Sequence, residues 1–396
     1  MKTPFRYTTA LASAAALVGL TLSSSALGEV KLGAPITHKN VQIFMIESPS
    51  TVVDLGEEIL TLQEGLEKKV VVVHETGTVS QLKIENKSDQ FVYVHAGDII
   101  KGGKQDRTLP NSFLVSPKSK IDIQSFCVES GRWEKRAGES VAQFSGSTKG
   151  LNSKNLKLAA RYAKNQGAVW QNVAVEQGKL SEKTGKNVQA ARSATSLQLT
   201  LEDKEIAKLA KEYQAALSDG VGPQLAKASG VAVVINGEFN SAEVLASPRL
   251  FGKLWPKMLE SIATEAVAEF DEKKEIKPLD ANAVLAALEE AESAEANAEK
   301  LADNNDILTR DGKDNVILDL EREVNGARLR VHRSVLAKGD FDYSAASAQQ
   351  QRGFANDIPL QQMRNVAPND AQQLQNPQPE ESTPQQRRGI LRRIFQ

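Results

Sequence analysis

The chain has few of the residues that most often carry chemistry in enzymes. Its 396 residues include one cysteine and four histidines. A single cysteine, Cys127, excludes an intramolecular disulfide, and in an oxidising compartment we expect it to be buried. The histidines are His38, His74, His95 and His332, and they do not have metal-ligand spacing. Because no cysteine pair exists either, the sequence predicts no metal site and no bound cofactor.

The sequence also lacks an excess of charge of either sign. Lysine and arginine number 49, aspartate and glutamate number 50, and the formal net charge is −1. Proteins that bind nucleic acid normally carry a basic excess or a basic patch, so we expect no nucleic-acid partner. Aromatic residues make up 5% of the chain and hydrophobic residues 40%. This composition allows a globular core, but not along the whole chain.

Long apolar runs are confined to the N-terminus. Residues 1–28 begin with the basic Lys2 and Arg6, continue with a short apolar stretch over 8–21 and end in small residues over 24–28. This is the pattern of a cleaved signal peptide, and an uncleaved signal anchor is the alternative. No later run is long and apolar enough to span a membrane. We therefore expect a periplasmic or extracellular protein.

The rest of the chain predicts one α+β domain over residues 29–345. Residues 40–147 contain short β-type runs separated by turns, which indicates an antiparallel, β-rich half. Residues 148–303 have mainly helical periodicity, with one strand and an Asn-Gly turn over 231–237. Residues 315–336 alternate like a hairpin that would close a sheet.

Local signals predict where the helices of the middle part begin and end. Residues 176–198 are polar and indicate a surface loop or a frayed helix. The stretch from Thr200 to Asp203 resembles a capping box for the next helix. We expect that helix to end at Gly220 and Pro223.

Further signals concern the C-terminal third. Ser247 and Pro248 fit a helix start, and Pro256 should kink or divide the helix that follows. Residues 281–302 are rich in alanine and glutamate and predict a surface helix, and residues 304–314 predict a polar break.

The end of the chain is compositionally different. Residues 346–396 are rich in glutamine, asparagine and proline, and this composition predicts a disordered tail. Residues 387–395 are basic and amphipathic, so they could make a weak contact with an anionic surface. The alternative is a tail that is simply solvated.

Two short motifs combine glycine, amide and charge beside apolar β-type sequence. They read Gly102-Gly103-Lys104-Gln105-Asp106-Arg107 and Cys127-Val128-Glu129-Ser130-Gly131-Arg132-Trp133. A hydrophobic core alone does not require this mixture. We expect the two motifs to meet at the edge of the sheet and to form the candidate site.

The first motif has the chemistry of an anion site. Lys104, Gln105 and Arg107 follow a glycine pair, which would let backbone N–H groups approach an anion. Arginine could bind a carboxylate or phosphate in bidentate fashion. The alternative is a turn whose arginine pairs with Glu129 or Asp98 inside the fold.

The second motif allows either an ion pair or catalysis. Glu129 and Arg132 could form an internal ion pair sealed by Trp133, or act as a general base and a substrate clamp. Cys127 would need a nearby base to act as a nucleophile. Its apolar neighbours instead favour a strand position facing the core.

Taken together, these motifs resemble the bacterial ARG and rhodanese-phosphatase-superfamily-associated protein domain. The resemblance spans roughly residues 30–345, with support from Gln166, Val169-Trp170 and the hairpin that contains Val331-His332. In that family, an asparagine usually precedes the arginine of the first motif. This chain has Asp106 at that position. The family name describes the domains that its members accompany, so the resemblance implies a fold rather than an activity.

These observations favour an exported cell-envelope module that binds or scaffolds, with Lys104, Gln105, Arg107 and Arg132 as ligand contacts. Its partner would be a small anionic ligand or an envelope protein. One alternative is an envelope hydrolase that uses Glu129 or Cys127 with Arg107 and Arg132. Another is a surface adhesin or oligomerisation protein that uses the alanine- and glutamate-rich helix and the tail.

Overall fold

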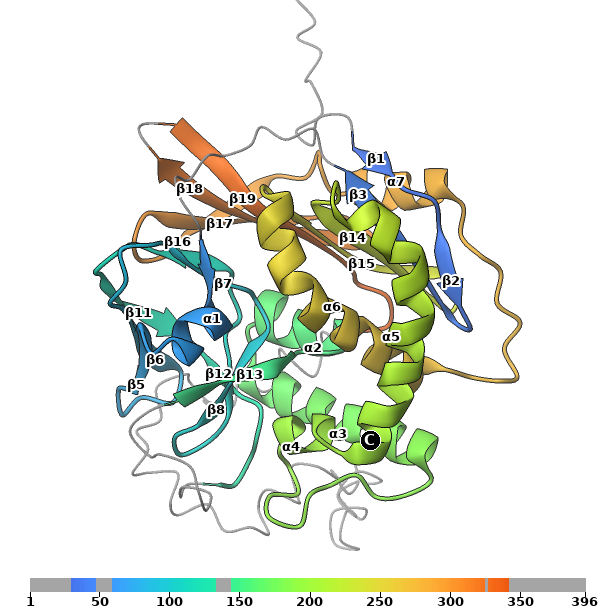
Figure 1. Cartoon of the computed structure of the whole chain (residues 1–396), viewed down its shortest axis with the longest axis horizontal. Helices are drawn as coiled ribbons and strands as arrows, with labels where there is room; N and C mark the ends of the chain where they lie inside the picture. The colour runs from blue at the N-terminus through green and yellow to red at the C-terminus, as the bar shows by residue number, and fades with distance from the viewer. Residues whose placement is uncertain (1–29, 48–58, 133–143, 325–326, 342–396) are drawn as a thin grey trace, which may run out of the picture.

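The computed structural model of the chain describes residues 30–47, 59–132, 144–324 and 327–341 (Figure 1). The expected signal peptide, the C-terminal tail, Trp133 and the turn at Asn325-Gly326 lie outside these residues. The described part combines helices with mainly antiparallel sheets, so the predicted α+β class is confirmed. None of the helices in these ranges is both long and apolar enough to cross a membrane.

The largest element is a nine-stranded antiparallel sheet that takes strands from both ends of the chain. The order is β1-β3-β14-β15-β19-β18-β17-β16, with β2 paired to β3. The strands are β1 (Lys31–Leu32), β2 (Ile36–His38), β3 (Val41–Glu47), β14 (Gly230–Ile235), β15 (Glu238–Leu245), β16 (Ala296–Lys300), β17 (Asn305–Asp311), β18 (Asn315–Val324) and β19 (Ala327–Ala337).

Both hairpins predicted from the sequence are present. Strands β14 and β15 are joined at Asn236 and Gly237, whose φ angles are 55° and 79°, the left-handed region that a tight two-residue hairpin turn needs. Strands β18 and β19 pair along their length. This second hairpin lies inside the sheet instead of closing its edge, because β19 also pairs with β15 and β18 with β17.

Helices pack on both faces of the large sheet because neighbouring side chains of each strand point to opposite faces. In β3, Ile43 and Met45 share a core cluster with side chains of helices α5 (Lys204–Leu225) and α6 (Pro248–Glu269). Phe44 and Ile46 instead share a cluster with side chains of α7 (Ala281–Glu289). Figure 1 shows α5 and α6 next to each other, and α6 also contacts β14.

Three smaller sheets lie beside the large one, with strand orders β10-β7-β4, β11-β6-β5 and β12-β9-β8-β13. Helix α1 (Leu62–Glu67) follows β4. The strands are β4 (Leu60–Thr61), β5 (Val71–Glu75), β6 (Gln81–Asn86), β7 (Val92–Val94), β8 (Asp98–Gly102), β9 (Arg107–Thr108), β10 (Phe113–Val115), β11 (Lys120–Gln124), β12 (Phe126–Cys127) and β13 (Phe144–Gly150).

The remaining helices are α2 (Lys154–Lys157), the π-helix η1 (Leu158–Tyr162), α3 (Gln166–Thr184) and α4 (Leu197–Leu201). Of the two alternatives for 176–198, a surface loop or a frayed helix, the helix is correct for the first part, since α3 continues to Thr184 with Leu180 buried. The capping box was also misplaced. Thr200 belongs to α4, and Asp203 caps α5 by accepting hydrogen bonds from two backbone N–H groups of its first turn.

Two further sequence predictions placed a helix break where the helix continues. Helix α5 continues past Gly220 and Pro223 to Leu225, since the loss of one backbone hydrogen bond so near its end has little effect. Helix α6 is one helix through Pro256, and the flanking Leu254 and Trp255 are buried in the core.

The predicted helix over 281–302 ends at Glu289, and residues 296–300 form the edge strand β16. The predicted polar break over 304–314 is largely the strand β17. Alanine and glutamate are good helix formers, but intrinsic propensity is a small energy per residue, and pairing of β16 with β17 along five residue pairs outweighs it.

Candidate functional site

The first motif forms the turn between β8 and β9. Gly102 and Gly103 have φ angles of 117° and 57°, a region that favours glycine. A Cβ atom at Gly103 would lie 2.6 Å from Oε1 of Glu75 and 2.6 Å from a ring carbon of Phe144. Glycine therefore lets this turn pack directly against β5 and β13.

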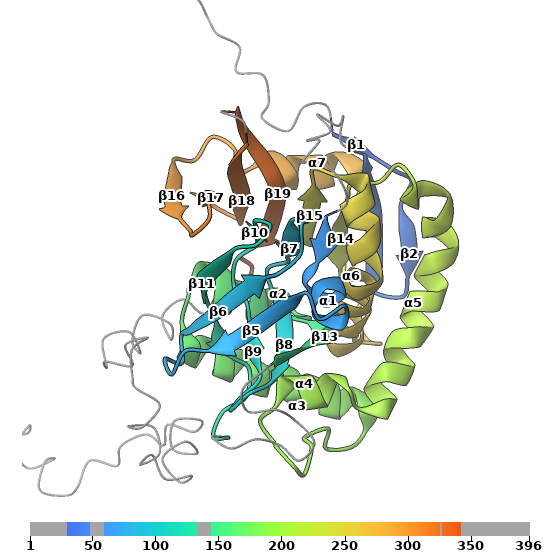
Figure 2. The ribbon, with the colours of Figure 1, turned by 60° about the vertical axis from the view of Figure 1, so that its left-hand side comes forward.

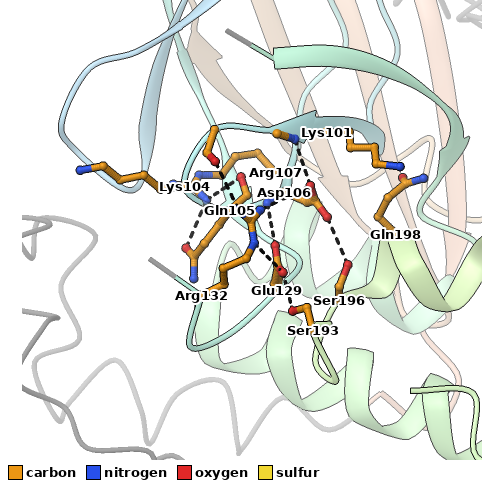
Figure 3. A network of polar contacts seen from close by, with 12 residues as sticks. Lys101, Lys104, Gln105, Asp106, Arg107, Glu129, Arg132, Ser193, Ser196 and Gln198 are labelled. Atoms are coloured by element: carbon orange, nitrogen blue, oxygen red, sulfur yellow. Dashed lines mark hydrogen bonds and ion pairs between the residues drawn. The ribbon is translucent and has the colours of Figure 1, made fainter. Parts of the chain in front are cut away.

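Asp106 connects this turn to the segment between α3 and α4 (Figure 3). Its Oδ1 accepts a hydrogen bond from the backbone N of Gly102 at 3.1 Å, and its Oδ2 accepts one from Oγ of Ser196 at 3.1 Å. Ser196 also caps α4, where its Oγ accepts from the backbone N of Leu199 at 3.1 Å. Asp106 stands at the position where the family usually has asparagine. Each of its two carboxylate oxygens thus accepts a hydrogen bond from another part of the fold.

Glu129 joins the two motifs. Its carboxylate accepts hydrogen bonds from the backbone N of Asp106 at 3.1 Å, from Nε of Arg132 at 2.8 Å and from Oγ of Ser193 (Figure 3). Burial acts to raise the pKa of this carboxyl, but the hydrogen bonds from Arg132 and Ser193 make the pKa lower than usual overall. A carboxylate held in this way stays ionised and is a weak base.

Arg132 lies on the other side of this ion pair. Its side chain is 10% exposed, and its guanidinium also donates to the carbonyl oxygen of Gly103 at 3.3 Å. Its Nη2 is 3.8 Å from Oδ1 of Asp106. The internal Glu129–Arg132 pair that the sequence suggested is therefore present, and it anchors the turn of the first motif.

Arg107 is 0% exposed and is only partly satisfied. Its Nη1 donates to the carbonyl oxygen and to Oε1 of Gln105, both at 3.2 Å. Its Nη2 lies 3.9 Å from Oε1 of Glu75, too far for a hydrogen bond. Within the described residues, Nε and Nη2 of Arg107 and Nε2 of Gln105 are buried without a hydrogen-bond partner. Buried donors of this kind commonly meet an ordered water or ion.

The carboxylate nearest to Arg107 differs from the sequence expectation. We expected Glu129 or Asp98 as the internal partner, but Glu75 at the end of β5 is the ion-pair neighbour. Asp98 instead pairs with Lys257 of α6 at 2.6 Å. The cause is the glycine turn, which packs on β5 and so brings Glu75 beside Arg107.

Lys104 and Cys127 do not add side chains to this network. The Lys104 side chain points away from it (Figure 3), although its backbone N donates to Glu75 at 3.3 Å. Cys127 is 0% exposed, and its backbone N–H and C=O both bond the side-chain amide of Gln166 at 2.8 Å. Burial raises the pKa of the Cys127 thiol to about 11, so little thiolate forms at neutral pH.

The structure thus gathers four of the six predicted site residues into one buried cluster, namely Gln105, Arg107, Glu129 and Arg132. Guanidinium and carboxylate groups enclosed together fix the geometry of the chain around them more than they stabilise it. No group of three histidine, cysteine, aspartate or glutamate side chains in the described part of the chain is placed to hold a metal ion.

A second buried polar cluster was not predicted. Oγ of Ser112 lies 2.9 Å from Nδ1 of His332, whose Nε2 lies 2.7 Å from Oε2 of Glu243. Nη1 of Arg161 is 3.4 Å from Oε1 of the same carboxylate. Burial acts to raise the pKa of Glu243, but Arg161 and His332 hold the pKa well below its usual range. These residues come from distant segments, so no sequence spacing could have revealed them.

The order serine, histidine, glutamate is that of an acyl-transfer triad, but its environment is different. Ser112 is 2% exposed, and its Oγ already accepts from the backbone N of Ala96 at 2.9 Å and from the hydroxyl of Tyr93 at 3.3 Å. The cavity beside Ser112 and His332 has a volume of about 10 Å³, room for about one water. Burial lowers the pKa of the adjoining His95 to about 3. This arrangement connects strands and leaves no space for a substrate.

A larger cleft of about 410 Å³ opens between β11 and β16, which lie beside each other in both views (Figures 1 and 2). Its apolar lining is Phe113, Ile121, Ile123, Phe126, Leu301 and Ala302. Its polar lining is Thr78, Ser80, Gln81, Asn111, Asp122, Gln124, Ser125, Glu299 and Lys300. Clefts of this size and mixed character are typical of ligand sites. The sequence could not predict it because one wall, β16, was expected to be helical.

Comparison with protein families gives one match. The family profile of the ARG and Rhodanese-Phosphatase-superfamily-associated Protein domain matches residues 29–336. The matched region contains both motifs and most of the β18–β19 hairpin. Comparison with curated proteins and with solved structures finds no match. The resemblance seen in the sequence is confirmed, and the chain belongs to the ARG and Rhodanese-Phosphatase-superfamily-associated Protein domain family.

Proposed function

We propose that the protein is an exported, non-catalytic binding module of the cell envelope, and that its partner binds in the cleft between β11 and β16. One observation carries this proposal: the cleft is of ligand-site size and is lined by both apolar and polar residues. Phe126, which directly precedes the second motif in the chain, also lines the cleft.

The chemistry of the candidate catalytic groups favours binding over hydrolysis. Glu129 accepts three hydrogen bonds and its pKa is lowered, which makes it a poor general base. Cys127 is enclosed and its thiol pKa is raised to about 11. The hydrolase alternative therefore stays a prediction without an observation in its favour. The adhesin alternative loses part of its premise, because residues 296–300 are a strand instead of a helix.

The expected location supports the same proposal. Residues 1–28 have the pattern of an export signal. A periplasmic or extracellular protein of this kind would meet envelope components after export. Detection of the intact chain in the cytoplasm, with residues 1–28 uncleaved, would contradict this part of the proposal.

A fragment screen followed by amide chemical shifts tests whether the cleft binds. Small apolar-polar fragments should shift the amides of residues that line the cleft, above all those of β11 and of residues 299–302. If the shifted amides instead cluster around Gln105 and Arg107, or scatter over the surface, the cleft is not the site.

A matched pair of variants provides the control. Ala302 is exposed and lines the cleft, so Ala302→Trp should fill it and abolish fragment binding. Ala296 is exposed on the same strand region but does not line the cleft, so Ala296→Trp should leave binding unchanged. Equal loss in both variants would mean that the effect is not specific to the cleft.

A second candidate function is the binding of a small anion by the first motif. The observation that favours it is the group of buried donors without partners on Arg107 and Gln105. Inorganic phosphate should then raise the melting temperature in a saturable way, and Arg107→Lys should remove the effect because lysine lacks the planar donor array. An equal response to chloride at the same ionic strength would indicate screening instead of binding.

A further inference from the structure

We infer that the occupant of the cleft is an extended segment of another polypeptide, which adds as a strand to the free edge of β11. This inference rests on the proposed function and names the partner class of the same site. It draws on three features of the described residues: the orientation of the β11 backbone, the run of consecutive residues along the cleft and the charge balance of its walls.

The backbone of β11 has one paired edge and one free edge. It ends its sheet, whose order is β11-β6-β5. The carbonyl oxygen of Ser119 accepts from the backbone N of Asn86 at 2.8 Å, and the backbone N of Ser125 donates to Ser80 at 2.9 Å. Because the groups of an antiparallel strand face its neighbour at every second residue, odd-numbered residues face β6. The backbone N–H and C=O of Asp122 and Gln124 therefore point away from β6.

That free edge faces the cleft. If a strand lined a groove only with its side chains, every second residue would contact the groove. Here the six consecutive residues 121–126 all line the cleft, which means that the strand presents its backbone edge to it. Among the described residues, no partner is recorded for the backbone N–H or C=O groups of Asp122 and Gln124. An unpaired edge of this kind is a template for another strand.

The opposite wall explains why such an edge can stay open. Residues 299–302 of β16 and its continuation line the other side of the cleft. A single extended chain could enter between the two walls. The edge of a whole second sheet could not, because it would clash with β16. Natural proteins protect free edges by covering or charging them, and β16 provides cover that still admits one strand.

The charges of the walls indicate which segment fits. Asp122 pairs with Lys83 at 3.2 Å, and Glu299 pairs with Lys164. Within the described part of the chain, the ammonium group of Lys300 has no recorded ion pair. The cleft therefore carries one unpaired positive charge, which is complementary to a carboxylate. We expect a segment with apolar side chains at alternate positions and one acidic residue near Lys300.

The test uses the mature full-length protein and synthetic peptides. The probe is an eight-residue peptide that alternates valine and threonine and carries one aspartate. Its counterpart has N-methyl groups on alternate amides, which removes the donors of one strand edge but keeps the side chains. The first peptide should bind and slow hydrogen exchange at the amides of Asp122 and Gln124. The methylated peptide should bind at least about tenfold more weakly.

A pair of substitutions tests the same edge from the protein side. Because the N–H of Asp122 points away from β6, Asp122→Pro removes a donor from the free edge without removing a hydrogen bond of the existing sheet. Asp122→Thr removes the same charge and keeps the donor. Asp122→Pro should weaken peptide binding at least about tenfold, and Asp122→Thr should not. Thermal unfolding of both variants identifies any general loss of structure.

The possible outcomes separate this inference from the proposed function. Equal binding of the two peptides would overturn strand addition. Failure of the peptides while small fragments still bind in the cleft would overturn the inference and leave the proposed function standing. If neither the peptides nor the fragments bind in the cleft, both the inference and the proposed function are wrong. Amides of Asp122 and Gln124 that already exchange slowly in the protein alone would mean that the chain fills its own edge, which also overturns the inference.

Discussion

Replacing Glu129 with glutamine tests whether the two motifs hold the fold or perform a reaction. Glutamine has nearly the same shape, so the change removes charge and one acceptor without creating a cavity. In the folded protein, Oε1 of Glu129 accepts from Arg132 and Ser193, and Oε2 accepts from the backbone N of Asp106. Either orientation of the new amide would place its NH₂ group against at least one of these donors.

The size of the effect follows from these contacts. Loss of one partner of a buried ion pair costs about 3–5 kcal/mol of unfolding free energy, because the other charge stays enclosed. Arg132 keeps its bond to Gly103 at 3.3 Å and remains 3.8 Å from Asp106, so we expect a value near the lower end, about 3 kcal/mol. For a domain of this size, residues 29–336, that corresponds to a fall in melting temperature of roughly 5 °C.

The assay is thermal and urea unfolding of Glu129→Gln beside a matched exposed pair. Asp89 pairs with Lys118 at 3.1 Å, but both side chains are largely exposed, so Asp89→Asn should change stability by less than about 1 kcal/mol. In addition, Arg132→Met combined with Glu129→Gln should cost less than the sum of the two single changes, because the double variant leaves no unpaired partner.

A catalytic role for Glu129 makes the opposite prediction, since an active-site carboxylate can usually be neutralised without unfolding the protein. A melting temperature of Glu129→Gln within about 2 °C of the parent would refute the reasoning above. The pH dependence gives a second criterion. Because the pKa of Glu129 is lowered in the folded state, its contribution should be complete above the pKa of the unfolded chain and should disappear as the pH falls through the folded-state pKa.

Three other predictions use different parts of the molecule. Cys127 is 0% exposed and its thiol pKa is raised to about 11 by burial. A thiol reagent should therefore modify it only after unfolding in urea. Rapid labelling of the native protein would contradict the buried position of this side chain. Burial, followed by the charge of Glu265, raises the pKa of Glu176 from 4.5 to about 8, so the folded state retains a proton that the unfolded chain releases. The stability contribution of Glu176 should therefore fall as the pH rises from about 4.5 to about 8, and urea titrations should show a weaker pH dependence for Glu176→Gln; an unchanged slope would mean that Glu176 is ionised in the fold. At Gly103, alanine would combine a positive φ with contacts at 2.6 Å from its Cβ; at Gly131, φ is also positive but an added Cβ would meet no atom within 4 Å. Gly103→Ala should therefore lower the melting temperature clearly more than Gly131→Ala. Equal effects would mean that the turn has room beside Glu75.

The elements that were predicted correctly have local signals. The turn at Asn236 and Gly237 is specified by the two residues that adopt positive φ, and Ser247 before Pro248 marks the start of α6. The errors occur where distant contacts decide. Residues 296–300 have helical composition, but they form β16 because β17 offers them a paired edge.

The candidate site divides in the same way. The two motifs could be expected to meet, since each combined charge with glycine in β-type sequence, and Glu129 and Arg132 do pair at 2.8 Å. The partner of Arg107 could not be predicted, because Glu75 reaches it only through the packing of the glycine turn on β5. The cluster around His332 could not be predicted from the sequence for a similar reason, since its hydrogen-bond partner Glu243 is 89 residues away in the chain.

The position of β3 in the large sheet also affects the time course of folding. This strand is made early, yet its long-range neighbour β14 begins at Gly230, so roughly 190 residues separate the paired positions. At about 5–20 residues per second, a ribosome needs roughly 10–40 s to make that interval. During it, β3 can form only its short local pairings with β1 and β2. The apolar strand must therefore remain soluble, or be shielded by another protein, until more than half of the polypeptide has been synthesised.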